Sequence, residues 1–380
     1  MIYLDAAATS AVRREVLEAM WPYLTGDFGN PSSHHTVGES AARALADARA
    51  SVAAWLGCRP TEVTFTSGGT EADNLAIKGI ALGNPRGRHI VTTPIEHEAV
   101  LESVDYLVRL HGFEATFLPV AADGLVAPAD LAAALRDDTT LVSVMLANNE
   151  VGTVQPIAEL AAIAHARRIP FHTDAVQAAG WLDLDVQRLG VDALSVSGHK
   201  IGAPKGIGAL YVRGRIPLEP VLHGGGQERG RRSGTENVAG AVALAAAARL
   251  ATAGRESNAQ RATEARDGFV SAVLAAVPDA RLTGHPTSRL PGTASFVFPG
   301  TNGEAVLLEL ERHGVVSSSG SACAAGSEDA SHVLLALGYP DDVARTAVRF
   351  SWGADVTAGQ LVEVAPAVAE AVREIASLGR

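Results

Sequence analysis

The hydrophobic positions alternate between two kinds of run from about residue 40 to residue 250. Short runs that are rich in β-branched residues end at Gly, Asn, Pro or Ser, as strands do. Longer runs between them repeat apolar residues at helical spacing and end near Gly or basic residues. We therefore predict helices over 70–83, 98–112 and 158–168, and strands within 61–68, 88–94, 115–120, 139–148, 169–176 and 193–199. This alternation predicts a mostly parallel sheet that helices cover on both faces.

The pattern changes beyond about residue 237, where an Ala-rich helical stretch runs to about residue 276. After it, we predict strands within 293–300, 315–320 and 346–353, and helices over 303–313 and 357–377. A chain of 380 residues exceeds one ordinary core, so about two domains are expected. We assign a large domain to residues 14–255 and a smaller α+β domain to residues 1–13 and 256–380.

Composition and charge narrow the class of protein. A hydrophobic content of 47% with few aromatic residues fits a compact α/β protein. The formal charge of −11 argues against a general nucleic-acid binder, which would carry a basic face. Two distant cysteines cannot form a disulfide framework, which favours a reducing, cytoplasmic setting. The start MIYLDAAATS does not read as a signal peptide, and the apolar segment 238–251 is shorter than the roughly 20 residues that span a bilayer.

The segment ALSVSGHKIGAPKGIGALYV, residues 193–212, places Lys200 in a turn of small residues after a predicted strand. A lysine at such a position can reach a pocket and form a Schiff base with a carbonyl. A surface lysine in a glycine-rich turn is the simpler interpretation of an isolated SGHK motif. The surrounding sequence decides between the two.

Two other predicted strands end in groups that suit pyridoxal phosphate. Asp174, in FHTDAVQ, supplies the carboxylate that such an enzyme needs on the pyridine nitrogen. Gly68, Gly69 and Thr70, in FTSGGTEADN, precede a helix, and free backbone N–H groups at a helix N-terminus bind phosphate. Ordinary helix capping by Glu71 is an alternative for that motif. A lysine, an aspartate and a phosphate cradle at three strand ends are unlikely to coincide by chance.

The stretch VVSSSGSACAAGSEDASH, residues 315–332, carries Cys323 among Ser, Gly and Ala. A loop without large apolar anchors has the low local stability that a moving segment requires. The alternative is that Cys323 only fills a turn, and we accept that interpretation for Cys58 in LGCRP. The adjacent His34 and His35 have no nearby Cys or carboxylate partners, so we predict no metal site.

Ten motifs in order resemble the cysteine desulfurases of the class V aminotransferase superfamily, and among them the long-loop group I. They are YLDAAATS, GNPSSHHTVG, TSGGTEADN, EHEAV, NNEVGTVQP, HTDAVQ, SGHKIGAPKGIG, GGGQERGRRSGTEN, SSGSACA and RFSWG. GGGQERGRRSGT and SSGSAC separate this group from its short-loop relatives. The resemblance implies the pyridoxal-phosphate-dependent transferase fold-type I, with a mostly parallel seven-stranded sheet in the large domain.

The same resemblance implies a role for each motif residue. Lys200 would hold pyridoxal 5′-phosphate covalently and remove the Cα proton, and His97 would stack on the ring and assist proton transfer. Cys323, on the small-domain loop, would be the nucleophile that takes the sulfur as a persulfide. Arg349 and Asn149 would orient the substrate carboxylate. The remaining cofactor contacts would come from Asp174, Gln177, Gly69, Thr70, Ser197, His199 and also Asn149, with Thr235 reaching the cofactor of the partner subunit.

The expected activity is therefore an L-cysteine desulfurase that yields L-alanine and protein-bound sulfur. The expected partners are a second copy of the chain and a sulfur-acceptor protein that docks near Cys323, with no membrane and no direct nucleic-acid contact. The acceptor could serve iron–sulfur assembly, transfer-RNA thiolation or DNA phosphorothioation. The alternatives are a selenocysteine lyase, another class V enzyme, and an inactive sulfur-relay scaffold. The joint presence of Lys200, Asp174, His97, Cys323 and Arg349 counts against the last.

Overall fold

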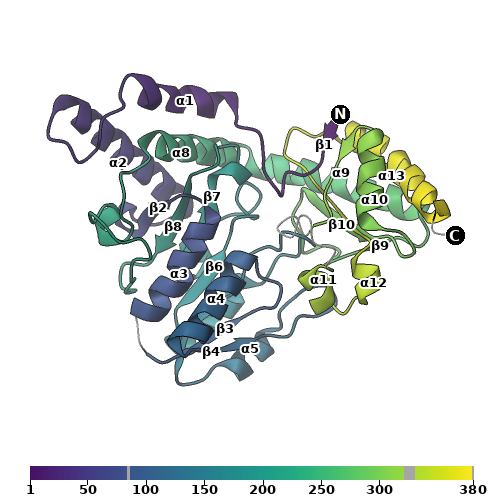
Figure 1. Cartoon of the computed structure of the whole chain (residues 1–380), viewed down its shortest axis with the longest axis horizontal. Coiled ribbons are helices and arrows are strands. Elements are labelled where there is room, and N and C mark those ends of the chain that lie inside the picture. Colours follow the sequence, from purple (N-terminus) through teal and green to yellow (C-terminus); the bar gives the residue numbers. More distant parts are fainter. Residues whose placement is uncertain (84–85, 321–329, 379–380) are drawn as a thin grey trace.

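A mixed seven-stranded sheet forms the centre of the larger part of the molecule (Figure 1). The computed structural model describes residues 1–83, 86–320 and 330–378. The sheet has the order β2-β8-β7-β6-β5-β3-β4, and five neighbouring strands from β4 to β7 run parallel. These five strands are β3 (His89–Thr92), β4 (Glu114–Phe117), β5 (Thr139–Ser143), β6 (Phe171–Asp174) and β7 (Ala193–Ser197). The prediction of a mostly parallel sheet is confirmed.

The other two strands close one edge of the sheet. β8 (Gly208–Val212) lies antiparallel between β7 and β2 (Val63–Thr66), and every residue of β8 is buried. The predicted strands do not include β8, although its sequence GALYV is as apolar as theirs. Since β8 returns antiparallel directly after β7, no helix separates the two strands, and the strand–helix alternation does not reveal it.

Helices cover both faces of the sheet, and the strand residues alternate between the two cores. Leu141 of β5 and Leu210 of β8 pack under α3 (Gly69–Gly83) and α4 (Glu98–His111). Their neighbours Val142 and Tyr211 face the opposite core. That core is covered by α2 (Thr36–Leu56), α5 (Pro128–Ala134), α6 (Ile157–Ala166) and α8 (Val238–Ala253). The predicted helices over 70–83, 98–112 and 158–168 correspond to α3, α4 and α6.

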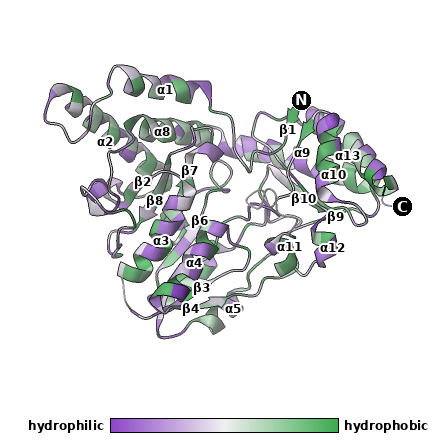
Figure 2. Cartoon of the chain, viewed as in Figure 1, coloured by the Kyte–Doolittle hydropathy of each residue, from purple (hydrophilic) through white to green (hydrophobic). Residues whose placement is uncertain are grey.

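The Ala-rich helical stretch over 237–276 forms two helices. α8 ends before Gly254 and α9 (Arg255–Ala276) begins directly after it, at an angle of 67° to α8. Hydrophobic residues predominate along α8, which packs on α1 (Arg14–Thr25) and α2 (Figure 2). Within the described residues, no single helix is long and apolar enough to cross a membrane, whereas the bent pair α8 and α9 meets the length and composition required.

A smaller part of the molecule lies beside this sheet and holds both chain termini (Figure 1). Its three-stranded sheet has the order β12-β10-β9, from Ala347–Ser351, Thr293–Val297 and Arg281–Leu282. α9, α10 (Gly303–Arg312) and α13 (Ala358–Leu378) pack on it around Phe269, Phe296 and Phe350. The strand expected within 315–320 is shorter than predicted: β11 (Val315–Val316) pairs only with the two residues of β1 (Ile2–Tyr3).

The short elements connect these layers. They are η1 (Pro60–Glu62), α7 (Val186–Leu189), η2 (Gly198–Lys200), η3 (Glu228–Gly230), α11 (His332–Ala336) and α12 (Asp341–Ala344). The N-terminal segment also crosses between the two parts. Leu4 lies in the core of the smaller part, whereas the Ser10 backbone N–H donates to His199 O beside β7. This crossing brings residues 5–10 against the end of β7.

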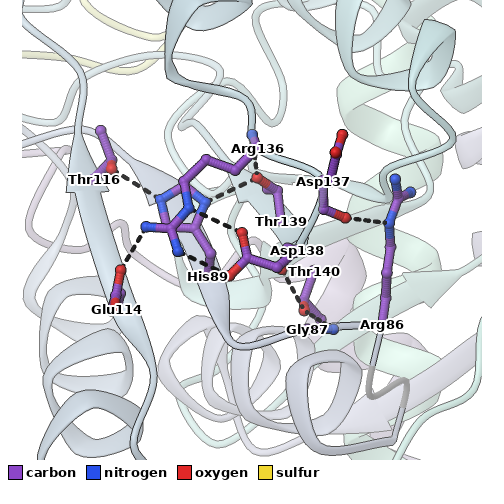
Figure 3. A network of polar contacts seen from close by, with 10 residues as sticks. All are labelled: Arg86, Gly87, His89, Glu114, Thr116, Arg136, Asp137, Asp138, Thr139 and Thr140. Carbon is purple, nitrogen blue, oxygen red and sulfur yellow. Dashed lines mark hydrogen bonds and ion pairs between the residues drawn. The ribbon is translucent and has the colours of Figure 1, made fainter.

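Polar side chains join β3, β4 and β5 where these strands begin (Figure 3). The two ring nitrogens of buried His89 lie 2.8 Å from the hydroxyls of Thr139 and Thr116. Arg136 forms ion pairs with Glu114 and Asp138 around this ring. These contacts hold the starts of the parallel strands together, and the predicted site residues follow the opposite ends.

Candidate active site

Lys200 ends the turn η2, directly after β7, as the sequence predicted. Its Nζ donates hydrogen bonds to the backbone carbonyls of Ala7 and Ala8, the latter at 2.9 Å. Gln177 Nε2 donates to the same Ala7 carbonyl at 3.0 Å. Lys200 and Gln177 also line a cavity of about 480 Å³, together with Trp352 from the smaller part. The crossing N-terminal segment therefore brings two predicted cofactor residues to one place.

Asp174 lies at the end of β6 and is almost fully buried. Burial raises the pKa of this carboxyl, while His97, the backbone N–H of Val176 and Lys200 lower it. The Val176 N–H donates to Asp174 Oδ1 at 2.8 Å. His97 caps α4, where its Nδ1 accepts a hydrogen bond from the Ala99 N–H at 3.0 Å. His97 thus combines a structural role with a position close enough to act on Asp174.

The N-terminus of α3 lies against the ends of β6 and β7. A Cβ atom on Gly69 would come within 2.7 Å of Val176 Cγ2, so only glycine permits this approach. Ser197 lies opposite, and its Oγ is buried without a hydrogen-bond partner among the described residues. Thr70 is exposed on the first turn of α3. A buried free hydroxyl beside helix N–H groups suits a phosphate, because both can donate hydrogen bonds to its oxygens.

His199 lies half-buried next to Lys200. Its Nδ1 is 3.1 Å from Thr9 Oγ1, and burial together with Lys200 and Lys205 lowers the pKa of His199 to about 4. The neutral ring keeps a hydrogen-bonding nitrogen, which suits contact with a polar group of a ligand. The backbone carbonyl of His199 also accepts from Ser10, so this turn is fixed to the N-terminal segment.

Arg349, on β12, is buried at the boundary between the two parts of the molecule. Its Nη2 forms an ion pair with Asp5 at 2.8 Å, and its Nη1 donates to the carbonyls of Asn149 at 2.9 Å and Gly320 at 3.3 Å. The Nε of Arg349 and the Oδ1 of Asn149 are buried and have no hydrogen-bond partner in the described structure. These two predicted substrate-binding residues are therefore adjacent, and both retain polar atoms that can receive a ligand.

The loop over 221–237, which carries Thr235, is fixed to α2 and β2 through Glu228 and Arg229. Glu228 is buried and forms two hydrogen bonds with Arg49, at 2.6 and 2.7 Å. Glu228 and Arg229 both adopt positive φ angles, 49° and 59°, which non-glycine residues rarely adopt. Thr235 is exposed, so a second chain could reach it.

The basic run over 229–232, which belongs to this loop, contacts the N-terminus of α3. Arg232 forms an ion pair with Glu71, in the first turn of α3, at 2.8 Å. The acidic residue that could have been only a cap therefore also connects the phosphate-cradle region to the loop.

The structure describes one of the two cysteines, Cys58. Cys323 lies outside the described residues. Cys58 is a free thiol whose pKa is raised to about 12 by burial, with Glu62 and Asp185 adding to the effect. A thiol with so high a pKa is a poor nucleophile, in agreement with the structural interpretation of Cys58.

No group of three metal-binding side chains occurs in the part of the chain that the structure describes. His35 instead caps α2, because its Nδ1 accepts a hydrogen bond from the Gly38 N–H at 3.1 Å. His35 therefore has a structural use.

The sequence reasoning missed a set of buried titratable residues around the site. Asp73, Glu96, Glu150 and His172 are all buried. Burial raises the pKa of Glu96 to about 8, although Met145 N–H and Thr93 Oγ donate to it. One signal was available: Asp73 occupies a position in α3 whose neighbours Ala72 and Ala76 face the core. A carboxyl on such a stripe is unusual unless it has a partner or a function.

The sequence and the fold of this chain are similar to those of many known proteins. A family model described as aminotransferase class V matches residues 2–364. A curated relative, cysteine desulfurase IscS of Methanosarcina thermophila, is 46% identical over 99% of this chain and 94% of that protein. A solved NifS-like protein superposes with a TM-score of 0.90 at 36% identity and covers 97% of this chain and 98% of that one. A structure described as SspA in complex with cysteine has a TM-score of 0.81 at 37% identity and covers 92% and 98%.

Proposed function

The chain belongs to the class V aminotransferase family, and we propose that it is a cysteine desulfurase that uses pyridoxal 5′-phosphate. One observation carries the proposal. Lys200, Asp174 and the N-terminus of α3 converge at the ends of β6 and β7, and the N-terminal segment that contacts Lys200 through Ala7 and Ala8 also contacts Arg349 through Asp5. The curated desulfurase at 46% identity and the neighbour in complex with cysteine support this activity.

The residues present fit the cofactor. The buried, unpartnered Ser197 Oγ and the glycine-only approach at Gly69 suit its phosphate. Thr70 and His199 would complete that contact. Asp174 would hold the pyridine nitrogen, and Gln177 would contact the phenolic oxygen. Lys200 would bind the cofactor covalently.

Bound pyridoxal phosphate withdraws electrons from the substrate and makes its sulfur open to attack by a thiolate. Arg349 and Asn149 would bind the carboxylate of L-cysteine and so fix its orientation. Lys200 would remove the Cα proton, with His97 close enough to Asp174 to assist proton transfer.

Cys323 would then take the sulfur. Its thiolate attacks the substrate sulfur, a new S–S bond forms, the substrate C–S bond breaks, and the carbon accepts a proton to become L-alanine. The products are one L-alanine and one persulfide on Cys323, so no external oxidant or reductant is consumed. A persulfide is useful only if it is transferred, so an acceptor protein would dock near this loop. Iron–sulfur assembly, transfer-RNA thiolation and DNA phosphorothioation all remain open as destinations.

We infer that two copies of the chain form the active enzyme. Thr235 is exposed on the loop over 221–237, and contact with the cofactor of a partner subunit would give it a use. α1 supports the inference, because Val16 is its one buried residue. Leu17, Trp21 and Leu24 of the same helix are exposed apolar residues that a second copy would cover.

The finer assignments are proposals of the same kind. The chain would belong to the long-loop group I, which the motifs GGGQERGRRSGT and SSGSAC support, and would work in a reducing, cytoplasmic setting that keeps Cys323 a thiol. We propose a large domain over residues 14–255 and a small domain from residues 1–13 and 256–380. The separate core that contains Leu4 and Phe350 supports this division.

The test is to incubate the purified protein anaerobically with L-cysteine and a thiol reductant, and to measure alanine and sulfide together. Wild type should release the two in equal amounts, whereas Cys323→Ala should release neither while keeping the cofactor absorbance near 400 nm. Cys58→Ala is the matched control and should behave as wild type. Desulfuration that survives in Cys323→Ala would remove Cys323 from the mechanism. Activity with selenocysteine alone would point to a lyase for that substrate.

A further inference from the structure

A chain of buried polar side chains lies beside Asp174, beneath α3. His172 Nδ1 is 2.9 Å from Ser143 Oγ, and His172 Nε2 is 3.0 Å from Ser195 Oγ. Asp73 Oδ1, from α3, lies 3.7 Å from the same Nε2. Asp174 is two residues after His172 on β6, and Ser195 of β7 pairs directly with Asp174. The chain therefore leads from β5 to the carboxylate that would hold the cofactor.

Asp73 is the unusual member of this chain. It is 1% exposed, and its Oδ1 has no hydrogen-bond partner among the described residues. Burial raises its pKa well above the usual range, the carboxyls of Asp174 and Glu96 raise it further, and the Ser195 hydroxyl lowers it. An ionised carboxylate at this position would be costly, because none of the groups that shift its pKa is a cation.

The neighbouring groups decide which carboxyl is ionised. His172 is neutral at ordinary pH, because burial lowers its pKa to about 3. Asp174 has His97 and Lys200 beside it, and both favour its ionised form. Two carboxylates that influence each other in a buried site do not both ionise readily, so the one with cationic neighbours keeps the charge.

We propose that Asp73 is a positioning residue for Asp174: it holds a proton in the folded protein and leaves Asp174 as the ionised carboxylate of the pair. This rests on the proposed function, in which Asp174 binds the pyridine nitrogen. A neutral Asp73 keeps Ser195 and His172 in place without adding a second negative charge beside Asp174. A positioned, singly charged Asp174 is what a protonated pyridine nitrogen requires.

Two full-length variants test the positioning role. Asp73→Asn keeps the size and the neutral polar character, so its cofactor dissociation constant should stay within about twofold of the wild-type value. Asp73→Ala removes the polar side chain that lies against His172 Nε2, so its cofactor binding should weaken about tenfold, the effect of one lost buried polar contact. Equal weakening in Asp73→Asn and Asp73→Ala would overturn the proposal, since it would mean that the charge of Asp73 is needed.

The proton on Asp73 is tested by stability against pH. An unfolded Asp loses its proton near pH 3.9, whereas the folded protein would keep it. Rising pH therefore destabilises wild type relative to Asp73→Asn, by about tenfold in the unfolding equilibrium per pH unit between pH 5 and the folded pKa. Urea midpoints at pH 5, 6, 7 and 8, followed by tryptophan fluorescence with saturating cofactor, would measure the difference in stability between wild type and Asp73→Asn at each pH.

Asp105→Asn on α4 is the matched control, because Asp105 is an exposed aspartate. Its substitution should change the stability relative to wild type by the same amount at every pH from 5 to 8. A stability difference between wild type and Asp73→Asn that does not change with pH would overturn the proposal. So would a wild type that is more stable than Asp73→Asn at neutral pH, the result expected if an ionised Asp73 paired with a protonated His172. The unfolding comparison does not require catalysis, so a chain without desulfurase activity would still give a result on Asp73.

Discussion

Arg349 and Asp5 form an ion pair across 344 residues of sequence, with Arg349 Nη2 2.8 Å from Asp5 Oδ1. The same guanidinium holds the carbonyls of Asn149 and Gly320, which precedes the segment that carries Cys323. Arg349 is thus the point where the N-terminal segment, the loop that follows β5 and the smaller part meet. A substrate carboxylate bound there would contact all three.

Arg349→Lys should raise the KM for L-cysteine by about 10- to 100-fold, because lysine cannot reproduce the planar bidentate contact. The fall in kcat should be smaller, since Lys200 and the proposed nucleophile are unchanged. Steady-state alanine release against cysteine concentration would measure both constants. An unchanged KM would remove Arg349 from substrate binding, and an intact absorbance near 400 nm would show that the cofactor is still bound.

Ser197→Ala should weaken cofactor binding by about 10- to 100-fold, which is the effect of one hydrogen bond to a charged group. The reason is that the buried Ser197 Oγ has no other partner in the described structure. Equilibrium titration of the cofactor-free protein would measure the change. Ser51→Ala, on α2, is the control and should bind the cofactor as wild type does, because the Ser51 hydroxyl contacts Arg249 of α8 and no predicted site residue. Equal affinity in Ser197→Ala and wild type would place the phosphate elsewhere.

Glu228→Gln should lower the free energy of unfolding by about 3 kcal/mol, because it leaves the buried Arg49 without its counter-charge. Urea unfolding followed by tryptophan fluorescence would measure the loss. The exposed pair Arg14–Glu18 provides the comparison, and Glu18→Gln should cost less than about 1 kcal/mol. Equal effects in the two variants would show that the buried pair does not hold the loop over 221–237.

His172 should make the protein sensitive to acid. Its pKa is lowered to about 3 by burial, whereas an unfolded histidine takes up a proton near pH 6.5. The unfolded state therefore binds more protons as the pH falls from about 6.5 towards 3, and stability falls by about 1.4 kcal/mol per pH unit. His172→Gln should flatten this slope in urea midpoints between pH 6.5 and 4.5, whatever its effect on absolute stability. A slope equal to that of wild type would show that other groups cause the acid sensitivity.

Trp21→Glu should shift the protein from dimer to monomer, because it places a charge on the exposed apolar face of α1. Light scattering after size-exclusion chromatography would measure the mass. Leu308→Glu, at a similarly exposed position on α10, should leave the mass unchanged. A dimer that survives Trp21→Glu would move the interface away from α1.

Much of this protein can be predicted from local sequence. The apolar periodicity predicts the parallel strands and α3, α4 and α6, and the chemistry of Lys200 and Asp174 follows from their places at strand ends. Parallel strands bring their carboxyl ends to one edge, so residues that follow different strands meet there without any knowledge of the packing. The phosphate cradle at Gly69 is predictable for the same reason, since it lies where a strand passes into a helix.

The tertiary structure decided the rest. Antiparallel β8, the break at Gly254 and the ion pair between Arg349 and Asp5 depend on how distant segments pack, which a local period does not contain. The same holds for Asp73, whose sequence shows only a carboxyl on an apolar helix stripe. Its partners His172 and Ser195 come from strands about 100 residues later, and their burial beside Asp174 sets the protonation that the sequence leaves open.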